Sequence, residues 1–306
     1  MAAEAPPVSV VVPTRDRPEL LRRAVVAILA QTYRGPVECV VVFDQSDPDL
    51  SWPSLPPGRR LVVIRNRRTP GLAGARNSGV LATTGELVAF CDDDDEWRPE
   101  KLARQVPGLV GTPSAAVSTT GIVVRHRDRA TTRLAPSVLV SHGQLLRSRL
   151  PELHPSTVLA RRRRLLDDIG LVDEQIPGGY AEDFDWLLRA SRLAPVLAVP
   201  EPLVVVHWHE GSFFADRWRT VIAALTYLVD KHRDLQREPS GLARIYGQIA
   251  FAHAALGERG PARRWARLAL ALDRRERRAW LALAVTLGLV RAPTVVRLAQ
   301  AAGKGI

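Results

Sequence analysis

The stretch LVAFCDDDDEWRP, residues 87–99, is the most informative part of this sequence. An apolar run of strand length ends in four consecutive aspartates, Asp92 to Asp95. Adjacent carboxylates repel one another unless something compensates their charge. Their hard oxygen ligands suit Mg²⁺ or Mn²⁺ rather than zinc, and the spacing of a calcium loop of the EF-hand type is missing. The alternative is a solvated acidic loop, or acids that cap a helix beginning near Pro99.

Three further apolar runs precede this one and alternate with amphipathic segments. They cover residues 8–12, 37–43 and 61–64. Asp16 and Glu19 have the spacing of a capping box, which predicts that a helix opens there. Residues 71–83 have the pattern of a glycine-led loop that enters a second helix. This order predicts an α/β fold with a mostly parallel sheet flanked by helices.

Polar residues follow the predicted strands at the point where each strand ends. Ligands of such sheets bind at the carboxyl ends of the strands. The residues concerned are Pro13, Thr14 and Arg15 after the first strand, Asp44 after the second and the aspartates after the fourth. We expect them to converge on one edge of the sheet.

Composition limits the class of protein. The chain has 306 residues, 46% of them hydrophobic and 25% charged, as in ordinary globular proteins. Cys39 and Cys91 lie within apolar runs, which favours free thiols in a reducing compartment. The amino terminus has neither a basic segment nor an apolar core of a signal peptide, and no apolar run reaches the roughly 18 residues of a spanning helix. We therefore expect a cytoplasmic protein.

The basic residues are concentrated in the last quarter of the chain. From Lys231 onward there are 15 Lys and Arg against 5 Asp and Glu, whereas the first 230 residues hold 28 and 27. This shift predicts a catalytic domain over residues 1–220 and a basic helical region over residues 221–306. The tail lacks the motifs of nucleic-acid-binding modules, so no nucleic acid is expected. Residues 250–282 resemble a tetratricopeptide-type helical hairpin, with a plain helical appendage as the alternative.

Several segments occur in the order found in one enzyme family. They are VSVVVPTRDRPELL (residues 8–21), VVVFDQS (40–46), GLAGARNSG (71–79), the acidic run and GGYAEDFDWLLRA (178–190). Over residues 7–217 the chain resembles family 2 glycosyltransferases. The resemblance implies a GT-A fold, Rossmann-like, followed by a small all-α region. It also implies an enzyme of the hexosyltransferase type (EC 2.4), which moves a sugar from a nucleotide-diphosphate donor to an acceptor hydroxyl in glycan, polysaccharide or glycoconjugate synthesis.

The resemblance also assigns the donor side of the site. Mn²⁺ or Mg²⁺ is the implied cofactor and a UDP-sugar the favoured donor, although Phe43 stands where the family usually has a first acid. By position, Asp94 coordinates the metal and Asp92 faces the ribose. Asp95 holds the loop that follows it, or a water molecule beyond the direct metal ligands. The remaining nucleotide-sugar contacts are Pro13, Thr14, Arg15, Asp44, Arg76 and Asp93.

On the acceptor side the resemblance points to Glu182 and Asp183. Asp183 would take the proton of the acceptor hydroxyl while Glu182 orients it, and direct displacement would invert the anomeric centre. The alternative is a pair of acids favoured by the dipole of a helix amino terminus. His209 precedes Gly211-Ser212 in the family's frame and is a candidate metal ligand or diphosphate contact, with a structural histidine as the alternative.

The acceptor implied by the family is a saccharide, a lipid-linked saccharide or a glycoconjugate. Arg263, Arg264 and Arg267 flank an apolar stripe that could lie on an anionic membrane, which would place the protein peripherally at the inner face. A helix packed within the protein, or contact with another protein, is the alternative. Two rival functions are a non-catalytic scaffold with a helical interaction tail and a sugar-phosphate nucleotidyltransferase. The second lacks the glycine-rich basic loop that it would need after the first strand.

Overall fold

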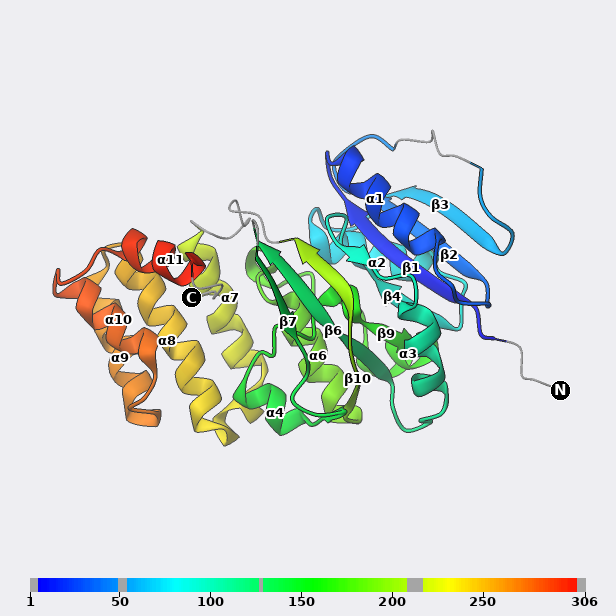
Figure 1. Ribbon diagram of the computed structural model, residues 1–306. Coiled ribbons are helices and arrows are strands. Elements are labelled where there is room, and N and C mark those ends of the chain that lie inside the picture. Colours follow the sequence, from blue (N-terminus) through cyan, green and yellow to red (C-terminus); the bar gives the residue numbers. More distant parts are fainter. Residues whose placement is uncertain (1–4, 49–53, 127–128, 208–216, 302–306) are drawn as a thin grey trace. The chain divides into compact units, whose positions relative to one another are not determined.

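The computed structural model describes residues 5–48, 54–126, 129–207 and 217–301 (Figure 1). The chain divides into two compact units. The first comprises Met1–His142, Leu150–Glu174 and Glu182–Trp208, and the second comprises Gly143–Arg149, Gln175–Ala181 and His209–Ile306. The predicted boundary near residue 220 stays a prediction.

A mixed sheet forms the centre of the first unit. Its strand order is β3-β2-β1-β4-β9-β6-β10-β5, with β7 beside β6 and β8 beside β10. The strands are β1 (Val8–Thr14), β2 (Val37–Phe43), β3 (Arg59–Arg65), β4 (Leu87–Phe90), β5 (Glu96–Trp97), β6 (Val117–His126), β7 (Arg129–Arg133), β8 (Leu139–Val140), β9 (Leu159–Arg161) and β10 (Val196–His207).

Helices and strands are interspersed as far as β10, and from α7 onward only helices follow. The helices are α1 (Pro18–Leu29), α2 (Leu72–Ala82), α3 (Lys101–Val110), α4 (His142–Arg147), α5 (Arg162–Arg164), α6 (Glu182–Leu193), α7 (Trp218–Lys231), α8 (Pro239–Ala255), α9 (Arg259–Leu272), α10 (Arg277–Thr286) and α11 (Ala292–Ala301). The predicted α/β class with a helical carboxyl-terminal region is confirmed.

The β-branched residues of β1 pack on both faces of the sheet. Val10 and Val12 lie in the core that contains the apolar stripe of α1, whereas the next residue along, Val11, faces α2. Strands β3, β2, β1 and β4 are parallel, so their carboxyl ends share one edge. Beyond β4 the pairing changes, because β9 runs antiparallel to both β4 and β6. The sheet is therefore parallel where the donor-side residues lie and mixed elsewhere.

The first helix begins differently from the prediction. The capping box is wrong: Asp16 has a φ of 52° and lies outside the helix, and the N-cap is Arg17, which makes no side-chain capping bond. Pro18 starts the helix instead, because its fixed φ suits the first helical position and it has no N–H to satisfy.

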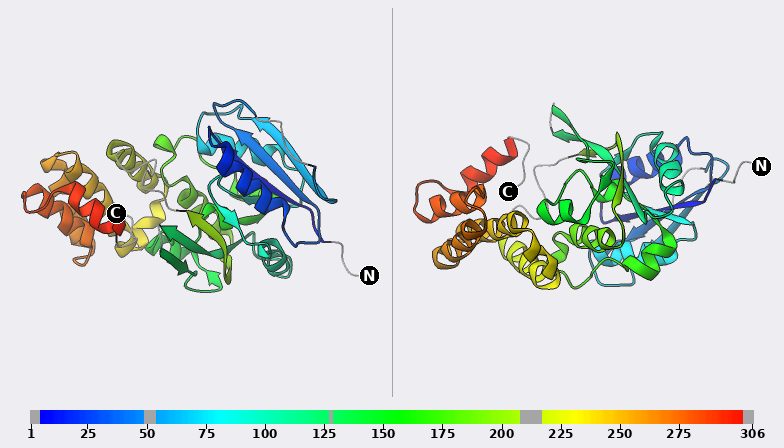
Figure 2. Two further views of the ribbon diagram at one scale, coloured as in Figure 1. Left: turned by 45° about the horizontal axis from the view of Figure 1, so that its top comes forward. Right: turned by 90° about the horizontal axis from the view of Figure 1, so that it is seen from below.

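The second unit has a core of small side chains. Helices α8, α9, α10 and α11 pack against one another (Figure 2). Buried alanines from each of the four helices form their core, among them Ala250, Ala266 and Ala282. Gly257, at a φ of 76°, allows the tight turn between α8 and α9. Among the described residues, no helix is long and apolar enough to cross a membrane.

Candidate active site

The four aspartates form a turn at the end of β4 in which buried and open side chains alternate. The Asp95 N–H donates to the Asp92 carbonyl at 3.1 Å and closes the turn. The side chains of Asp92 and Asp94 are 21% and 26% exposed, whereas those of Asp93 and Asp95 are 7% and 2% exposed. The run thus presents two carboxylates outward and keeps two inside.

Asp93 joins the acidic turn to the end of β1. Thr14 Oγ1 donates to Asp93 Oδ2 at 2.7 Å, and Arg17 Nη1 lies 3.3 Å from Asp93 Oδ1. Burial raises the pKa of Asp93 to about 6, against the opposing effect of the Thr14 hydrogen bond. Arg17 also pairs with Asp94 Oδ2 at 3.0 Å. The contacts of Thr14 and Arg17 connect the end of β1 to the acidic turn after β4. The sequence predicts this convergence, because parallel strands end at the same edge of the sheet.

Asp95 is bound by the turn that precedes β9. Ser156 Oγ donates to Asp95 Oδ2 at 2.5 Å and accepts the Asp92 N–H at 3.0 Å. His154 Nδ1 lies 3.3 Å from the same Asp95 oxygen. Burial raises the pKa of Asp95 to about 7.

These contacts create a group of possible metal ligands. Asp92, Asp95 and His154 each offer one ligand atom, and the three atoms all lie within 4.8 Å of one another. Asp94, the predicted ligand, lies outside this group and contacts Arg17. His209 lies outside the described residues.

Arg76 bonds to carboxylates from both halves of the predicted site. Its side chain is 3% exposed, with Nη2 2.6 Å from Asp92 Oδ1 and Nη1 2.5 Å from Glu182 Oε1. Burial alone would lower the pKa of Arg76, but the two carboxylates raise it above its ordinary value, so the guanidinium stays charged. Arg76 therefore links the acidic turn to the first residue of α6.

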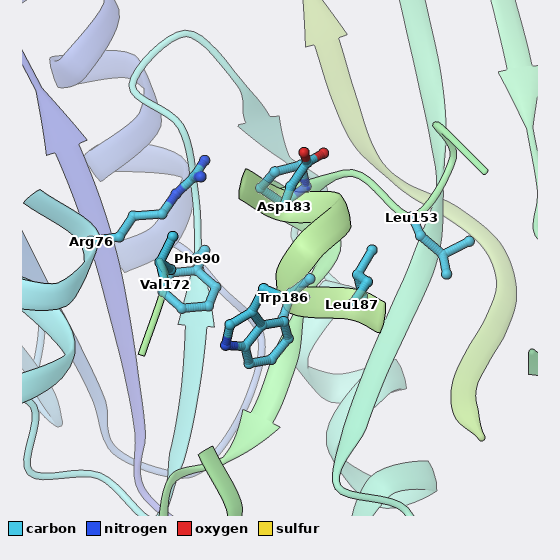
Figure 3. Close-up of a pocket in the computed structure, with 9 residues that line it drawn as sticks. Arg76, Phe90, Leu153, Val172, Asp183, Trp186 and Leu187 are labelled. Carbon is cyan, nitrogen blue, oxygen red and sulfur yellow. The ribbon is translucent and has the colours of Figure 1, made fainter. Parts of the chain in front are cut away.

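The first turn of α6 places its three acids in different surroundings. Asp185 is fully buried and pairs with Arg189 at 3.0 Å, and Glu182 is buried against Arg76. Asp183 is partly exposed and lines a cavity of about 20 Å³ floored by Phe90 and Trp186. Figure 3 shows the Asp183 carboxylate above these apolar side chains, with the Arg76 guanidinium on the same side of the pocket. Of the three acids, Asp183 is the one that is partly exposed.

The remaining predicted residues lie at the ends of β1 and β2. Asp44 is 7% exposed and accepts hydrogen bonds from Asn66 Nδ2 at 2.8 Å and from the Gly71 N–H at 3.0 Å. Pro13 and Thr14 are buried, whereas Arg15 is exposed. Asp44 thus anchors the loop that enters α2.

The family model described as "Glycosyl transferase family 2" matches residues 9–169, just over half of the chain. The chain belongs to glycosyltransferase family 2. It is therefore a glycosyltransferase, as the resemblance implied, and the acidic turn and Arg76 lie within the matched region. Glu182 and Asp183 lie beyond it.

Two curated relatives illustrate the similarity. The uncharacterized glycosyltransferase YwdF of Bacillus subtilis is 27% identical over 210 residues, which cover 67% of this chain and 75% of YwdF. The Escherichia coli protein WfaP, a UDP-Glc:alpha-D-GlcNAc-diphosphoundecaprenol beta-1,3-glucosyltransferase, is 30% identical over 101 residues, which cover 32% of this chain and 39% of WfaP.

The fold of this family 2 glycosyltransferase matches a solved GT-A structure. The mannosyltransferase PcManGT from Pyrobaculum calidifontis, in complex with GDP-Man and Mn²⁺, superposes with a TM-score of 0.58 at 21% identity, covering 98% of this chain and 81% of PcManGT. The predicted GT-A fold is confirmed.

The sequence pattern alone gives no role at the acidic turn to Arg17, His154 or Ser156. Arg17 lies in the first segment that carries the family resemblance, and nothing in that segment indicates that it pairs with two of the aspartates. Ser156 lies 61 residues from Asp95, so no local spacing connects them. The sequence feature that could have indicated this contact is the pair of hydroxyl residues, Ser156 and Thr157, before the strand β9.

Proposed function

We propose that this protein transfers a hexosyl group from a nucleotide-diphosphate sugar to an acceptor hydroxyl, with a divalent metal and with inversion of the anomeric centre. The observation that supports this best is the position of Arg76, which contacts Asp92 of the acidic turn and Glu182 of the acceptor-side pair. This contact supports the proposal, because transfer needs the carboxylates that we assign to the donor and to the acceptor in one site.

The donor set is compatible with the metal. Two carboxylates and an imidazole lie within reach of a single ion, and carboxylates suit Mn²⁺ and Mg²⁺. The imidazole nitrogen favours Mn²⁺ of the two. A bound cation would neutralise the departing diphosphate. The family resemblance implies Asp94 as a metal ligand, and we propose it as one. The distances between ligand atoms favour a second set, Asp92, Asp95 and His154.

Asp183 is proposed as the general base. As the acceptor oxygen bonds to the anomeric carbon, its proton passes to Asp183, and the bond from that carbon to the phosphate oxygen breaks with its electron pair leaving on the diphosphate. The partly exposed carboxylate above an apolar floor suits this task, because a base must reach the proton it removes. Glu182, fixed by Arg76, would orient the start of α6.

Donor and acceptor are proposed only by class. WfaP is named for a UDP-sugar and PcManGT was solved with GDP-Man, so relatives differ in their nucleotide. A UDP-sugar is our first choice, with Pro13, Thr14, Arg15, Asp44 and Asp93 on the nucleotide side. The acceptor is a saccharide, a lipid-linked saccharide or a glycoconjugate, since WfaP is named for a lipid diphosphate acceptor.

Peripheral contact with an anionic membrane remains a proposal for the basic helices. On α9, Leu268 and Leu272 are 42% and 38% exposed beside exposed arginines, while Trp265 packs on Tyr246 at 5.0 Å between ring centroids. Vesicles with anionic lipid should therefore carry the protein upward in flotation at low salt. If it stays at the bottom of the gradient, the membrane proposal is wrong.

The test of the function is a screen for nucleoside diphosphate release from UDP- and GDP-sugars, with and without Mn²⁺. We expect release from one donor class only when metal is present, and much less from Asp94→Ala. Asp167→Asn, an exposed acid in the same unit, is the matched control and should retain full activity. Full activity of wild type in EDTA would contradict the metal role, and full activity of Asp94→Ala would contradict Asp94 as a ligand.

A further inference from the structure

Glu174 connects helix α2 to the loop of residues 66–71 that precedes it, all within the first unit. Its side chain is 14% exposed, and its Oε1 accepts a hydrogen bond from Asn77 Nδ2 at 2.6 Å and lies 2.5 Å from Arg68 Nε. Its Oε2 accepts the Thr69 N–H at 3.2 Å. Burial alone would raise the pKa of Glu174, but the hydrogen bonds from these three residues lower it to about 2. Glu174 is therefore an ionised acceptor for both the helix and the loop.

Asn77 fixes the backbone beside Glu174. Its Nδ2 donates to the Val172 carbonyl at 2.8 Å, and its Oδ1 accepts the Val172 N–H at 2.9 Å. Asn77 is 1% exposed and directly follows Arg76 in α2. The segment that carries Glu174 is thus bound to α2 through its backbone as well as through the carboxylate. The loop is therefore attached to a fixed position.

The loop that Glu174 holds supplies hydrogen bonds to Asp44 at the end of β2. Asn66 Nδ2 donates to Asp44 Oδ1 at 2.8 Å, and the Gly71 N–H donates to Asp44 Oδ2 at 3.0 Å. Asn66 Oδ1 also accepts the Arg68 N–H at 2.9 Å. Arg68 thus contacts Glu174 with its side chain and Asn66 with its backbone. Direct contacts therefore lead from Glu174 to the Asp44 carboxylate.

We infer that Glu174 is a positioning residue for the donor nucleotide, because it holds the loop whose N–H groups fix the Asp44 carboxylate. Asp44 is 7% exposed, so its orientation depends on these hydrogen bonds. Without the Glu174 carboxylate, Arg68 and Thr69 lose a charged acceptor and the loop loses this attachment. Glu174 lies beyond the residues that the family model matches. The nucleotide contact of Asp44 rests on the proposed function, whereas the attachment of the loop to Glu174 does not.

The test is a double-mutant cycle of Glu174→Ala and Asp44→Asn, with calorimetric titration of the full chain by UDP and by GDP in Mn²⁺. Each single change should weaken binding of the preferred nucleotide about tenfold, as for loss of a hydrogen bond to a charged group. The double variant should bind about as weakly as Asp44→Asn alone, because both changes remove one contact. Glu201→Ala, an acid of the same unit 3.7 Å from Arg104, is the matched control and should bind as wild type does. Additive losses, or unchanged affinity of Glu174→Ala, overturn the inference.

Donor hydrolysis separates a positioning role of Glu174 from a merely structural one. Partial unfolding reduces the amount of active enzyme and therefore kcat, whereas a misplaced Asp44 weakens donor binding and raises KM. Glu174→Ala should raise KM for the donor about tenfold at nearly unchanged kcat, in line with the loss of affinity. Glu174→Gln, which keeps one acceptor oxygen, should restore part of the affinity. A lower kcat at unchanged KM in Glu174→Ala means that the acid serves stability alone.

Hydrogen exchange of the Gly71 amide tests the loop without any nucleotide. That N–H donates to Asp44, so it should exchange faster in Glu174→Ala than in Glu201→Ala. If wild type binds neither nucleotide and hydrolyses no donor, yet Gly71 exchanges faster in Glu174→Ala, the proposed function fails and the attachment of the loop stands. If Asp44→Asn weakens nucleotide binding while Glu174→Ala changes neither binding nor exchange, the role of Glu174 is wrong and the proposed function stands.

Discussion

Arg76 Nη2 lies 2.6 Å from Asp92 Oδ1, in a place where the arginine side chain is 3% exposed. The same guanidinium reaches Glu182, so α2 carries one cation that holds the acidic turn and the start of α6. A buried cation of this kind needs its partners, because removing one of them leaves an uncompensated charge. The Arg76 contacts therefore fix the spacing between the two groups of acids.

Arg76→Lys should keep the charge but lose the planar fork that bonds both acids. We expect turnover to fall about 100-fold, as for a misplacement of reacting groups by about 1 Å. Released nucleoside diphosphate measures it. Arg104→Lys, on an exposed arginine 3.7 Å from Glu201, is the control and should change little. Normal turnover of Arg76→Lys would show that the spacing between the acidic turn and the acids of α6 does not depend on the planar guanidinium of Arg76.

Asp183→Asn and Asp185→Asn should separate catalysis from stability. Loss of the proposed base should lower transfer by about 10²–10⁴-fold while donor binding persists. Asp185→Asn should instead lower the melting temperature, because Asp185 is fully buried and pairs with Arg189. Transfer kinetics and thermal unfolding of both variants give the comparison. A normal transfer rate in Asp183→Asn would place the base elsewhere.

Ser156→Ala should raise the Mn²⁺ concentration needed for half-maximal activity. Ser156 Oγ orients Asp95 and accepts the Asp92 N–H, and loss of such supporting contacts costs about 10–100-fold in metal affinity. Ser118→Ala is the matched control, since Ser118 is a fully buried serine of the same unit whose Oγ has no hydrogen-bond partner among the described residues. An unchanged Mn²⁺ requirement in Ser156→Ala would exclude Asp92 and Asp95 as the metal-binding pair.

The sequence predicted those parts of the site that depend on local pattern. Runs of β-branched residues gave the parallel strands, and parallel strands bring Thr14 and the aspartates to one edge. The antiparallel half of the sheet and the contact of Ser156 with Asp95 depend on tertiary pairing over long separations, which no periodicity encodes. The same holds for Arg76, whose burial between two acids follows from packing of α2.

Lys101 should make stability depend on pH. Burial lowers its pKa to about 7, below its ordinary value of 10.5. Between these values the unfolded chain binds one more proton than the folded chain, so the free energy of unfolding should rise with pH from about 7 to 10.

Lys101→Met, which removes the ammonium that lies 3.9 Å from the Trp97 ring centroid and keeps an unbranched side chain, should remove that part of the pH dependence. In urea unfolding, the free energy of unfolding of Lys101→Met should exceed that of wild type by the largest amount near pH 6.5, and this difference should shrink toward pH 9.5. Lys231→Met, at an exposed position, is the control. A constant difference across this pH range would mean that Lys101 does not titrate on folding.

Gly79→Ala should disturb both stability and catalysis, because Gly79 lies where α2 rests on the sheet. A Cβ there would be 2.3 Å from Val11 Cγ1 and 3.0 Å from Val42 Cγ2, so the helix must move outward. Overpacking of this kind costs about 1–3 kcal/mol in the free energy of unfolding.

Arg76 lies one helical turn from Gly79, so the same displacement should loosen its contacts with Asp92 and Glu182 and lower turnover. Gly260→Ala, at a helical position with nothing within 4 Å of a new Cβ, should leave turnover unchanged and stabilise the protein by up to about 1 kcal/mol. Urea unfolding and donor hydrolysis of both variants test this coupling. If Gly79→Ala loses stability yet keeps full turnover, the position of α2 does not control the site.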